Sequence, residues 1–254
     1  MARRRTQGKC HICGQFGDLS FEHVPPEAAF NNRPIRVKSG MQLVNADLDD
    51  ERGRTQQRGA GGYTLCERCN SLTGTWYGSA YVDWACQGLH LSQYASQAPS
   101  LYFTYHLFPL RVVKQVICMF FSTNGPEFRE AHPDLVKFVL DKNFCYLPHR
   151  IRLFAFLYGG TRGRRSGVSG MMNINTGRMG VLSEIVFPPF GFVMCFESPP
   201  PDERLAEITW FSQFGYNDWK DASLRLAVLP IYTGYPGDYR SRETVLSESG
   251  EGGA

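Results

Sequence analysis

The chain has 254 residues, of which 43% are hydrophobic and 20% are charged, and its formal net charge is +3. This length allows one large domain or two small ones, and the charge neither requires nor excludes a polyanionic partner. No apolar run is long enough to cross a bilayer, which excludes a membrane-spanning helix and predicts no membrane partner. The basic start "ARRR" lacks a following apolar segment, so we expect no signal peptide and a cytoplasmic protein with reduced thiols.

Composition and turn signals divide the chain into four parts. We expect a basic flexible tail at residues 1–9 and a mostly disordered tail at residues 234–254, which end in "SESGEGGA". Between them we expect a cysteine-containing domain at residues 10–97 and a second domain at residues 98–233. The boundary falls at the break "SQAPS".

The first domain contains two closely spaced cysteine pairs. They are "CHIC" (Cys10 and Cys13) and "CERC" (Cys66 and Cys69). A C-x-x-C turn presents two thiolates, and two such turns complete a tetrahedron around a structural zinc ion. Because a small zinc domain has little core of its own, the metal would supply much of its folding energy. The alternative interpretation is a redox dithiol, which has the same spacing.

A short strand is predicted at residues 19–24, between the two cysteine pairs, and it carries Glu22 and His23. Alternation along a strand places neighbouring side chains on opposite faces, unless the strand ends or bulges there. Pro25 and Pro26 predict such an end. By itself, an acidic residue beside a histidine is more often a solvated pair than a site.

A helix is predicted over "TGTWYGSAYVDWACQG", directly after the second cysteine pair. Its aromatic residues have helical spacing, which favours a place in the core over stacking on nucleobases. Gly74 and Gly78 weaken a helix, so we expect packing or close backbone approach to explain them. The aromatic residues are Trp76, Tyr77, Tyr81 and Trp84.

The second domain begins with helical patterns and continues with strands. Apolar spacing in "FPLRVVKQVICMFF" predicts a mostly buried helix, and Pro133 lies near the start of a shorter one in "HPDLVKFVLDK". Five later segments are rich in β-forming residues and are separated by Gly and Pro turns. This order predicts an α+β layout with a mainly antiparallel sheet. The five segments are "IRLFAFLY", "GVSGMMNIN", "MGVLSEIVF", "FGFVMCFE" and "SLRLAVLPIY".

A glycine-rich loop in this domain carries Arg162, Arg164 and Arg165. These arginines are candidates for contact with nucleic-acid phosphates. The alternative, an exposed and solvated turn, is slightly favoured because turns with a few arginines are common.

The order of the first domain's motifs, C-x-x-C, acidic-His-Val-x-Pro and C-x-x-C-Asn, resembles the HNH or ββα-metal nucleases, especially the endonuclease VII-like branch. The resemblance covers about residues 8–80. It implies an N-terminal zinc-stabilised ββα-metal nuclease domain in which the four cysteines hold a structural zinc ion. It further implies that His23 is the general base and that Glu22 and Asn70 are ligands of a catalytic divalent cation.

Elementary chemistry agrees with these implied roles. Phosphodiester hydrolysis requires a deprotonated water and neutralisation of the charge that gathers on phosphorus. A neutral histidine can take a proton from water near pH 7. Glu22 and Asn70 offer oxygen ligands, which suit Mg²⁺ or Mn²⁺. The expected function is therefore metal-dependent endonuclease activity on nucleic acid, with DNA as the first expectation.

The chain departs from the family pattern in three ways. Glu22 replaces the more usual Asp, and residues 35–62 contain a long insertion. In addition, "GGYTLC" has no asparagine where many HNH proteins place one to orient the histidine; a backbone carbonyl could serve instead. The alternative interpretation is a non-catalytic zinc-ribbon protein that binds nucleic acid. By analogy with the family, the second domain could mediate dimerisation or bind a partner protein, and the protein could restrict foreign DNA.

Overall fold

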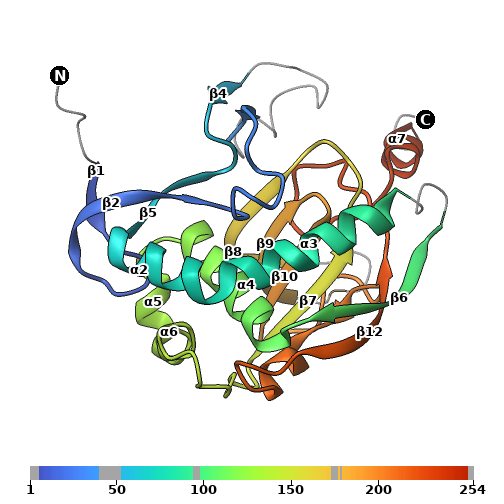
Figure 1. The fold of residues 1–254 in the computed structure, drawn as a ribbon. Helices are drawn as coiled ribbons and strands as arrows, with labels where there is room; N and C mark the ends of the chain where they lie inside the picture. Colours follow the sequence, from blue (N-terminus) through green and yellow to red (C-terminus); the bar gives the residue numbers. More distant parts are fainter. Residues whose placement is uncertain (1–5, 40–52, 94–97, 173–176, 178, 251–254) are drawn as a thin grey trace.

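The computed structural model describes residues 6–39, 53–93, 98–172, 177 and 179–250 (Figure 1). As predicted, the fold is α+β and its sheets are mainly antiparallel. Part of the predicted insertion, residues 40–52, lies outside the described residues, and so do residues 94–97 at the predicted domain boundary.

The N-terminal region is a three-stranded antiparallel sheet followed by a long helical segment. The strand order is β1-β2-β5, and α2 begins directly after β5. The helical segment continues from α2 through a π-helical turn, η1, into α3. The insertion forms a separate pair of strands, β3 and β4. The elements are β1 (Thr6–Lys9), β2 (Phe16–His23), β3 (Ile35–Val37), β4 (Arg54–Gln56), β5 (Gly61–Cys66), α2 (Glu67–Thr73), η1 (Gly74–Gly78) and α3 (Ser79–Ser92).

Helix α4 (Pro109–Thr123) is the central helix of the molecule, and its residues are buried on nearly every side. It begins with a proline, which suits the first helical turn because that turn has no partner for its N–H groups. A helix that is apolar all round is stable only inside a core, and the sequence predicted this burial. Two short helices follow, α5 (Phe128–Ala131) and α6 (Pro133–Leu140).

The remaining chain forms a five-stranded antiparallel sheet and a two-stranded ribbon. The sheet has the order β11-β7-β10-β9-β8, and the ribbon pairs β12 with β6. Helix α3 crosses in front of the sheet (Figure 1). The elements are β6 (Ser100–Leu107), β7 (Ile151–Leu157), β8 (Arg164–Met172), β9 (Met179–Phe187), β10 (Phe190–Phe196), β11 (Ala206–Glu207), the 3₁₀ turn η2 (Thr209–Gln213), β12 (Lys220–Ala227) and α7 (Arg242–Gly250).

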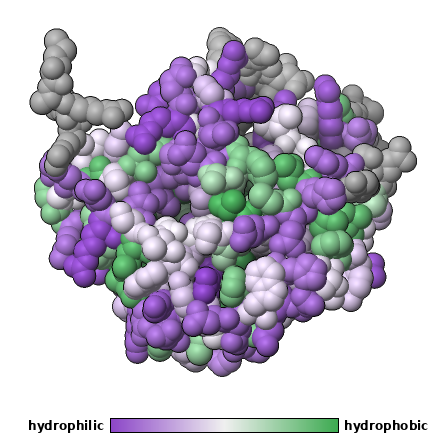
Figure 2. Space-filling view, in the orientation of Figure 1, coloured by the Kyte–Doolittle hydropathy of each residue, from purple (hydrophilic) through white to green (hydrophobic). Residues whose placement is uncertain are grey.

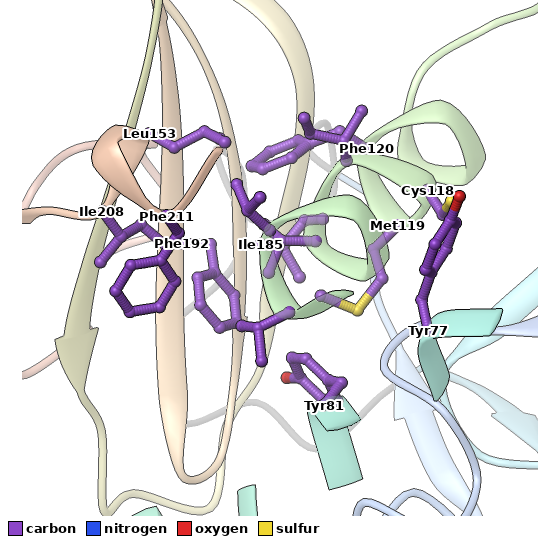
Figure 3. Close-up of a cluster of buried hydrophobic side chains, with 14 of the residues drawn as sticks. Tyr77, Tyr81, Cys118, Met119, Phe120, Leu153, Ile185, Phe192, Ile208 and Phe211 are labelled. Atoms are coloured by element: carbon purple, nitrogen blue, oxygen red, sulfur yellow. The ribbon is translucent and has the colours of Figure 1, made fainter. Parts of the chain in front are cut away.

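One hydrophobic cluster includes side chains from both predicted domains. In it, Met119 and Phe120 of α4 lie between Phe192 and Ile185 of the sheet and Tyr81 of α3 (Figure 3). The helical aromatic residues belong to this core, as predicted: Tyr77, Tyr81 and Trp84 are buried and Trp76 packs against them. Trp84 stacks on Phe190 with ring centroids 4.3 Å apart. The N-terminal region is therefore packed against the rest of the chain through a shared core.

The two predicted tails differ from expectation where the structure describes them. Residues 6–9 form β1, which pairs with β2 because both strands have free backbone groups at that edge. Tyr239 is buried, packs on Phe156 and donates a hydrogen bond to Glu184 at 2.6 Å. Its aromatic ring covers the sheet and holds the segment that leads into α7. Residues 1–5 and 251–254 lie outside the described residues.

Among the described residues, no helix combines the length and the hydrophobicity needed to span a membrane. Hydrophilic residues predominate on the face of the molecule that Figure 2 shows, with smaller hydrophobic patches between them.

Candidate metal centre and adjacent cleft

The four paired cysteines converge at one point beside the N-terminal sheet. Their Sγ atoms all lie within 4.8 Å of one another, and Cys13 and Cys66 are 3.8 Å apart. A tetrahedron with zinc–sulfur bonds of about 2.3 Å has sulfur–sulfur edges of about 3.8 Å. The cluster, Cys10, Cys13, Cys66 and Cys69, can therefore hold a metal ion such as zinc.

The turn that carries the first cysteine pair is built for this close approach. Gly14 has a φ of 76°, which is a left-handed conformation that glycine adopts without strain. Its N–H donates to the Cys10 carbonyl at 2.9 Å. A hydrogen bond from the Cys69 thiol lowers the pKa of Cys10. One thiolate is thus favoured before any metal binds, and metal binding would displace the remaining protons.

A cleft of about 470 Å³ opens next to the cysteine cluster. It lies between the end of β2, the helical segment from α2 to α3, and one residue of α4. The three residues that the sequence assigned to the cation and the general base all line it. The lining that matters chemically is Glu22, His23, Asn70, Asp83, Glu27 and Gln115.

A β-bulge explains why Glu22 and His23 both reach this cleft. The pairing of β2 with β5 shifts register between Ser20 and Phe21, so the simple alternation of faces is interrupted just before the Glu-His pair. Glu22 is 7% exposed, and burial raises the pKa of its carboxyl to about 8. In the described part of the chain the carboxyl has no hydrogen-bond or ion-pair partner. Such a buried acceptor calls for a proton or a cation.

Asn70 is held so that its oxygen remains available. Its Nδ2 donates to Ser20 Oγ at 3.0 Å and to the Phe21 carbonyl at 3.3 Å. These bonds tie the amide nitrogen to the bulged strand, which leaves Oδ1 as the free end of the carboxamide. Asn70 follows Cys69 in the first turns of α2, so the metal centre and the carboxamide share one rigid backbone segment.

His23 is half-buried, and its ring meets the edge of Phe21 with centroids 4.9 Å apart. Among the described residues it has no hydrogen-bond partner. Gly61 is the residue opposite His23 in β5, and a Cβ there would lie 2.1 Å from the Glu22 carbonyl oxygen. No side chain fits at that position, which explains why the orienting asparagine of the family pattern is missing. An aromatic contact orients His23 instead.

Two residues near His23 were missed by sequence reasoning. The buried Asn31 donates to the carbonyls of Pro25 and Ala60 at 2.7 Å each, and its Oδ1 accepts from the Ala60 N–H at 2.6 Å. It therefore clamps the turn after His23 to the approach to β5. The guanidinium of Arg58 lies 4.4 Å from the centre of the Phe21 ring, at the edge of the cleft. The only signals in the sequence were a single amide and a single arginine.

The role expected for the two helical glycines is corrected by the structure. A Cβ added at Gly74 or Gly78 would have no neighbour within 4 Å. Both glycines line the cleft. They are therefore not sites of tight packing; the absence of side chains leaves open space over the helix.

The three arginines of the glycine-rich loop do not belong to this cleft. Arg164 is buried and forms a two-bond ion pair with Glu184, at 2.5 and 3.1 Å. Its guanidinium is thus engaged inside the protein and does not offer a phosphate contact, which corrects that candidate. Arg162 and Arg165 are exposed and lie apart from the cleft.

The donor set of the cleft fits a hard divalent cation. Glu22 and Asn70 present oxygens that suit Mg²⁺ or Mn²⁺, and Glu27 and Asp83 add negative charge at the rim. Comparison of the chain with protein-family models, with curated proteins and with solved structures gives no match.

Proposed function

We propose that the protein is a metal-dependent endonuclease of the HNH type that hydrolyses phosphodiester bonds in nucleic acid, with DNA as the first substrate to test. One observation carries the proposal: Glu22, His23 and Asn70 line a single open cleft beside a four-cysteine cluster. This is the combination that the resemblance in the sequence implied.

The roles of the residues follow from their chemistry. His23 takes a proton from a water molecule, whose oxygen then bonds to phosphorus while the bond to the leaving sugar oxygen breaks. Asn70 and Glu22 bind the cation through oxygen, and the hydrogen bonds of Asn70 fix the direction of its Oδ1. A bound Mg²⁺ or Mn²⁺ would supply the positive charge that stabilises the developing charge on phosphate.

The charge of the cleft supports metal dependence. Its acidic groups are Glu22, Glu27 and Asp83, and they would repel a phosphodiester in the absence of a cation. A divalent cation reverses this local balance. We therefore expect binding of substrate in the cleft, as well as turnover, to require Mg²⁺ or Mn²⁺.

The cysteine cluster is assigned a structural zinc ion. Four thiolates close the shell of a tetrahedral ion and leave no position for substrate. Because Cys69 and Asn70 are adjacent in α2, a zinc ion in the cluster would stabilise the backbone that positions the cation ligand.

A second candidate is a nucleic-acid-binding protein without catalysis. It is favoured by the lack of a hydrogen-bond partner for His23 among the described residues, since a general base is usually oriented by one. Plasmid cleavage with Mg²⁺, with Mn²⁺ and with neither separates the two. The nuclease assignment predicts nicking only with a divalent cation. DNA binding without cleavage under all three conditions would favour the second candidate.

A further inference from the structure

Gln115 places an unpaired oxygen in the wall of the cleft. The residue lies in α4 and is 2% exposed, and its Oε1 is buried without a hydrogen-bond partner in the described part of the chain. Trp84 and Thr123 also have such an atom, but of the three residues only Gln115 lines the cleft. A buried acceptor without a donor is rare in native proteins, and an ordered water or an ion is the usual explanation.

The carboxyl of Glu22 is a second buried acceptor without a partner in the same cleft. Two acceptors that face one space cannot satisfy each other unless a donor or a cation lies between them. The small exposed area of Gln115 admits a ligand the size of a water molecule and is too small to receive a nucleobase. These features together indicate a hydrated cation.

We infer that Gln115 is a positioning residue for the divalent cation, and that its Oε1 accepts a hydrogen bond from a water molecule bound to that cation. The inference rests on the proposed function. Mg²⁺ and Mn²⁺ keep several waters when few protein oxygens bind them, and metal-bound waters are strong donors. Groups that hydrogen-bond to the ligands of a metal typically change its affinity by about 10- to 100-fold.

The position of Gln115 suits this role because its backbone is rigid. The neighbouring Lys114 is fully buried and donates to the carbonyls of Asp141 and Phe144 at 2.7 Å each. Helix α4 begins at Pro109, beyond the region that resembles the HNH nucleases. The cation site is thus completed by the second region of the chain, and residues 10–97 alone would lack one of its oxygens.

The test is the zinc-loaded Gln115→Met protein, studied by thermal denaturation and by Mn²⁺ titration with electron paramagnetic resonance. Methionine has a similar volume but no comparable acceptor. Without Mn²⁺, the Tm should be unchanged or higher, because removing an unpaired polar group breaks no hydrogen bond. The Kd for Mn²⁺ should rise roughly 10-fold. Gln115→Glu retains an oxygen acceptor and should bind Mn²⁺ at least as tightly as the unsubstituted protein.

Gln213→Met is the matched control, because Gln213 is exposed and lies outside the cleft. It should leave the Kd for Mn²⁺ unchanged. If Gln115→Met binds Mn²⁺ as tightly as the unsubstituted protein, the inference fails while the proposed function stands. If it binds Mn²⁺ normally and melts at a lower temperature, Gln115 has a structural role. If the unsubstituted protein binds no Mn²⁺ beyond its zinc, the proposed function fails together with the inference.

Discussion

The four-cysteine cluster and the adjacent cleft use the same strands and the same helix, yet their polar atoms are arranged in opposite ways. In the cluster, four sulfurs face one another within 4.8 Å. In the cleft, Glu22 and Gln115 face open space without a donor among the described residues. A closed ligand shell contributes stability, whereas unpaired buried acceptors reduce it and are explained by what they bind. The comparison separates a site for folding from a site for chemistry.

The largest effect should come from breaking the closed site. Cys66→Ser removes one of four ligands, and structural zinc contributes on the order of 10 kcal/mol to such domains. We expect loss of bound zinc and unfolding of the N-terminal region, measured by metal analysis and circular dichroism. Cys86→Ser is the control, since Cys86 is exposed and outside the cluster. A Cys66→Ser protein with full zinc content and unchanged Tm would contradict the assignment.

The open site should respond in the opposite way, with loss of turnover and no loss of fold. His23→Ala should lower the cleavage rate by roughly two to four orders of magnitude, the usual contribution of a general base. Zinc content, Tm and DNA affinity should not change. His106→Ala is a suitable control because His106 is exposed and pairs with Asp221 away from the cleft. Full cleavage activity in His23→Ala would remove His23 from the mechanism.

Asn31 tests whether the two sites depend on one support. Asn31→Ala removes three hydrogen bonds to buried backbone groups, so the free energy of unfolding should fall by about 2–4 kcal/mol. Because Asn31 holds the turn after His23, the cleavage rate should fall too, while zinc content is retained. Denaturant unfolding and metal analysis provide the measurements, with the neighbouring exposed Asn32→Ala as control. Equal stability of the two variants would show that the clamp contributes nothing.

The smallest expected effect is a dependence on pH that belongs to the cleft alone. Burial raises the pKa of Glu22 to about 8, so the folded protein binds more protons than the unfolded chain over a range that ends near pH 8. The free energy of unfolding of the cation-free protein should therefore fall as pH rises toward 8. A cation must displace this proton, so Mn²⁺ affinity should rise about tenfold per pH unit below 8.

Calorimetry of Mn²⁺ binding in buffers of different ionisation enthalpy measures that proton release. In Glu22→Gln the side chain no longer titrates, so the fall in stability toward pH 8 should be lost. Mn²⁺ binding to the unsubstituted protein without proton release at pH 6.5 would show that Glu22 is not a ligand.

Much of the local structure could be predicted because its cause lies within a few residues. Pro109 and the apolar spacing after it predicted α4, and alternating β-forming segments between turns predicted the antiparallel strands. The two cysteine pairs predicted the cluster, since each pair is one tight turn and only the meeting of the turns is a tertiary event. The assignment of Glu22, His23 and Asn70 depended on the order of motifs, and the chemistry proposed for them stays a prediction.

What the sequence alone determined is therefore the set of elements, the buried helix and the metal-binding residue types. The tertiary structure decided which distant groups meet: Asn31 with Ala60, Tyr239 with Glu184, and Gln115 with the cleft. It also decided that Gly74 and Gly78 border open space. These outcomes depend on contacts between residues far apart in the chain, often with backbone atoms that any residue type provides. No local pattern records such a contact, because the partner leaves no mark on the residues beside it.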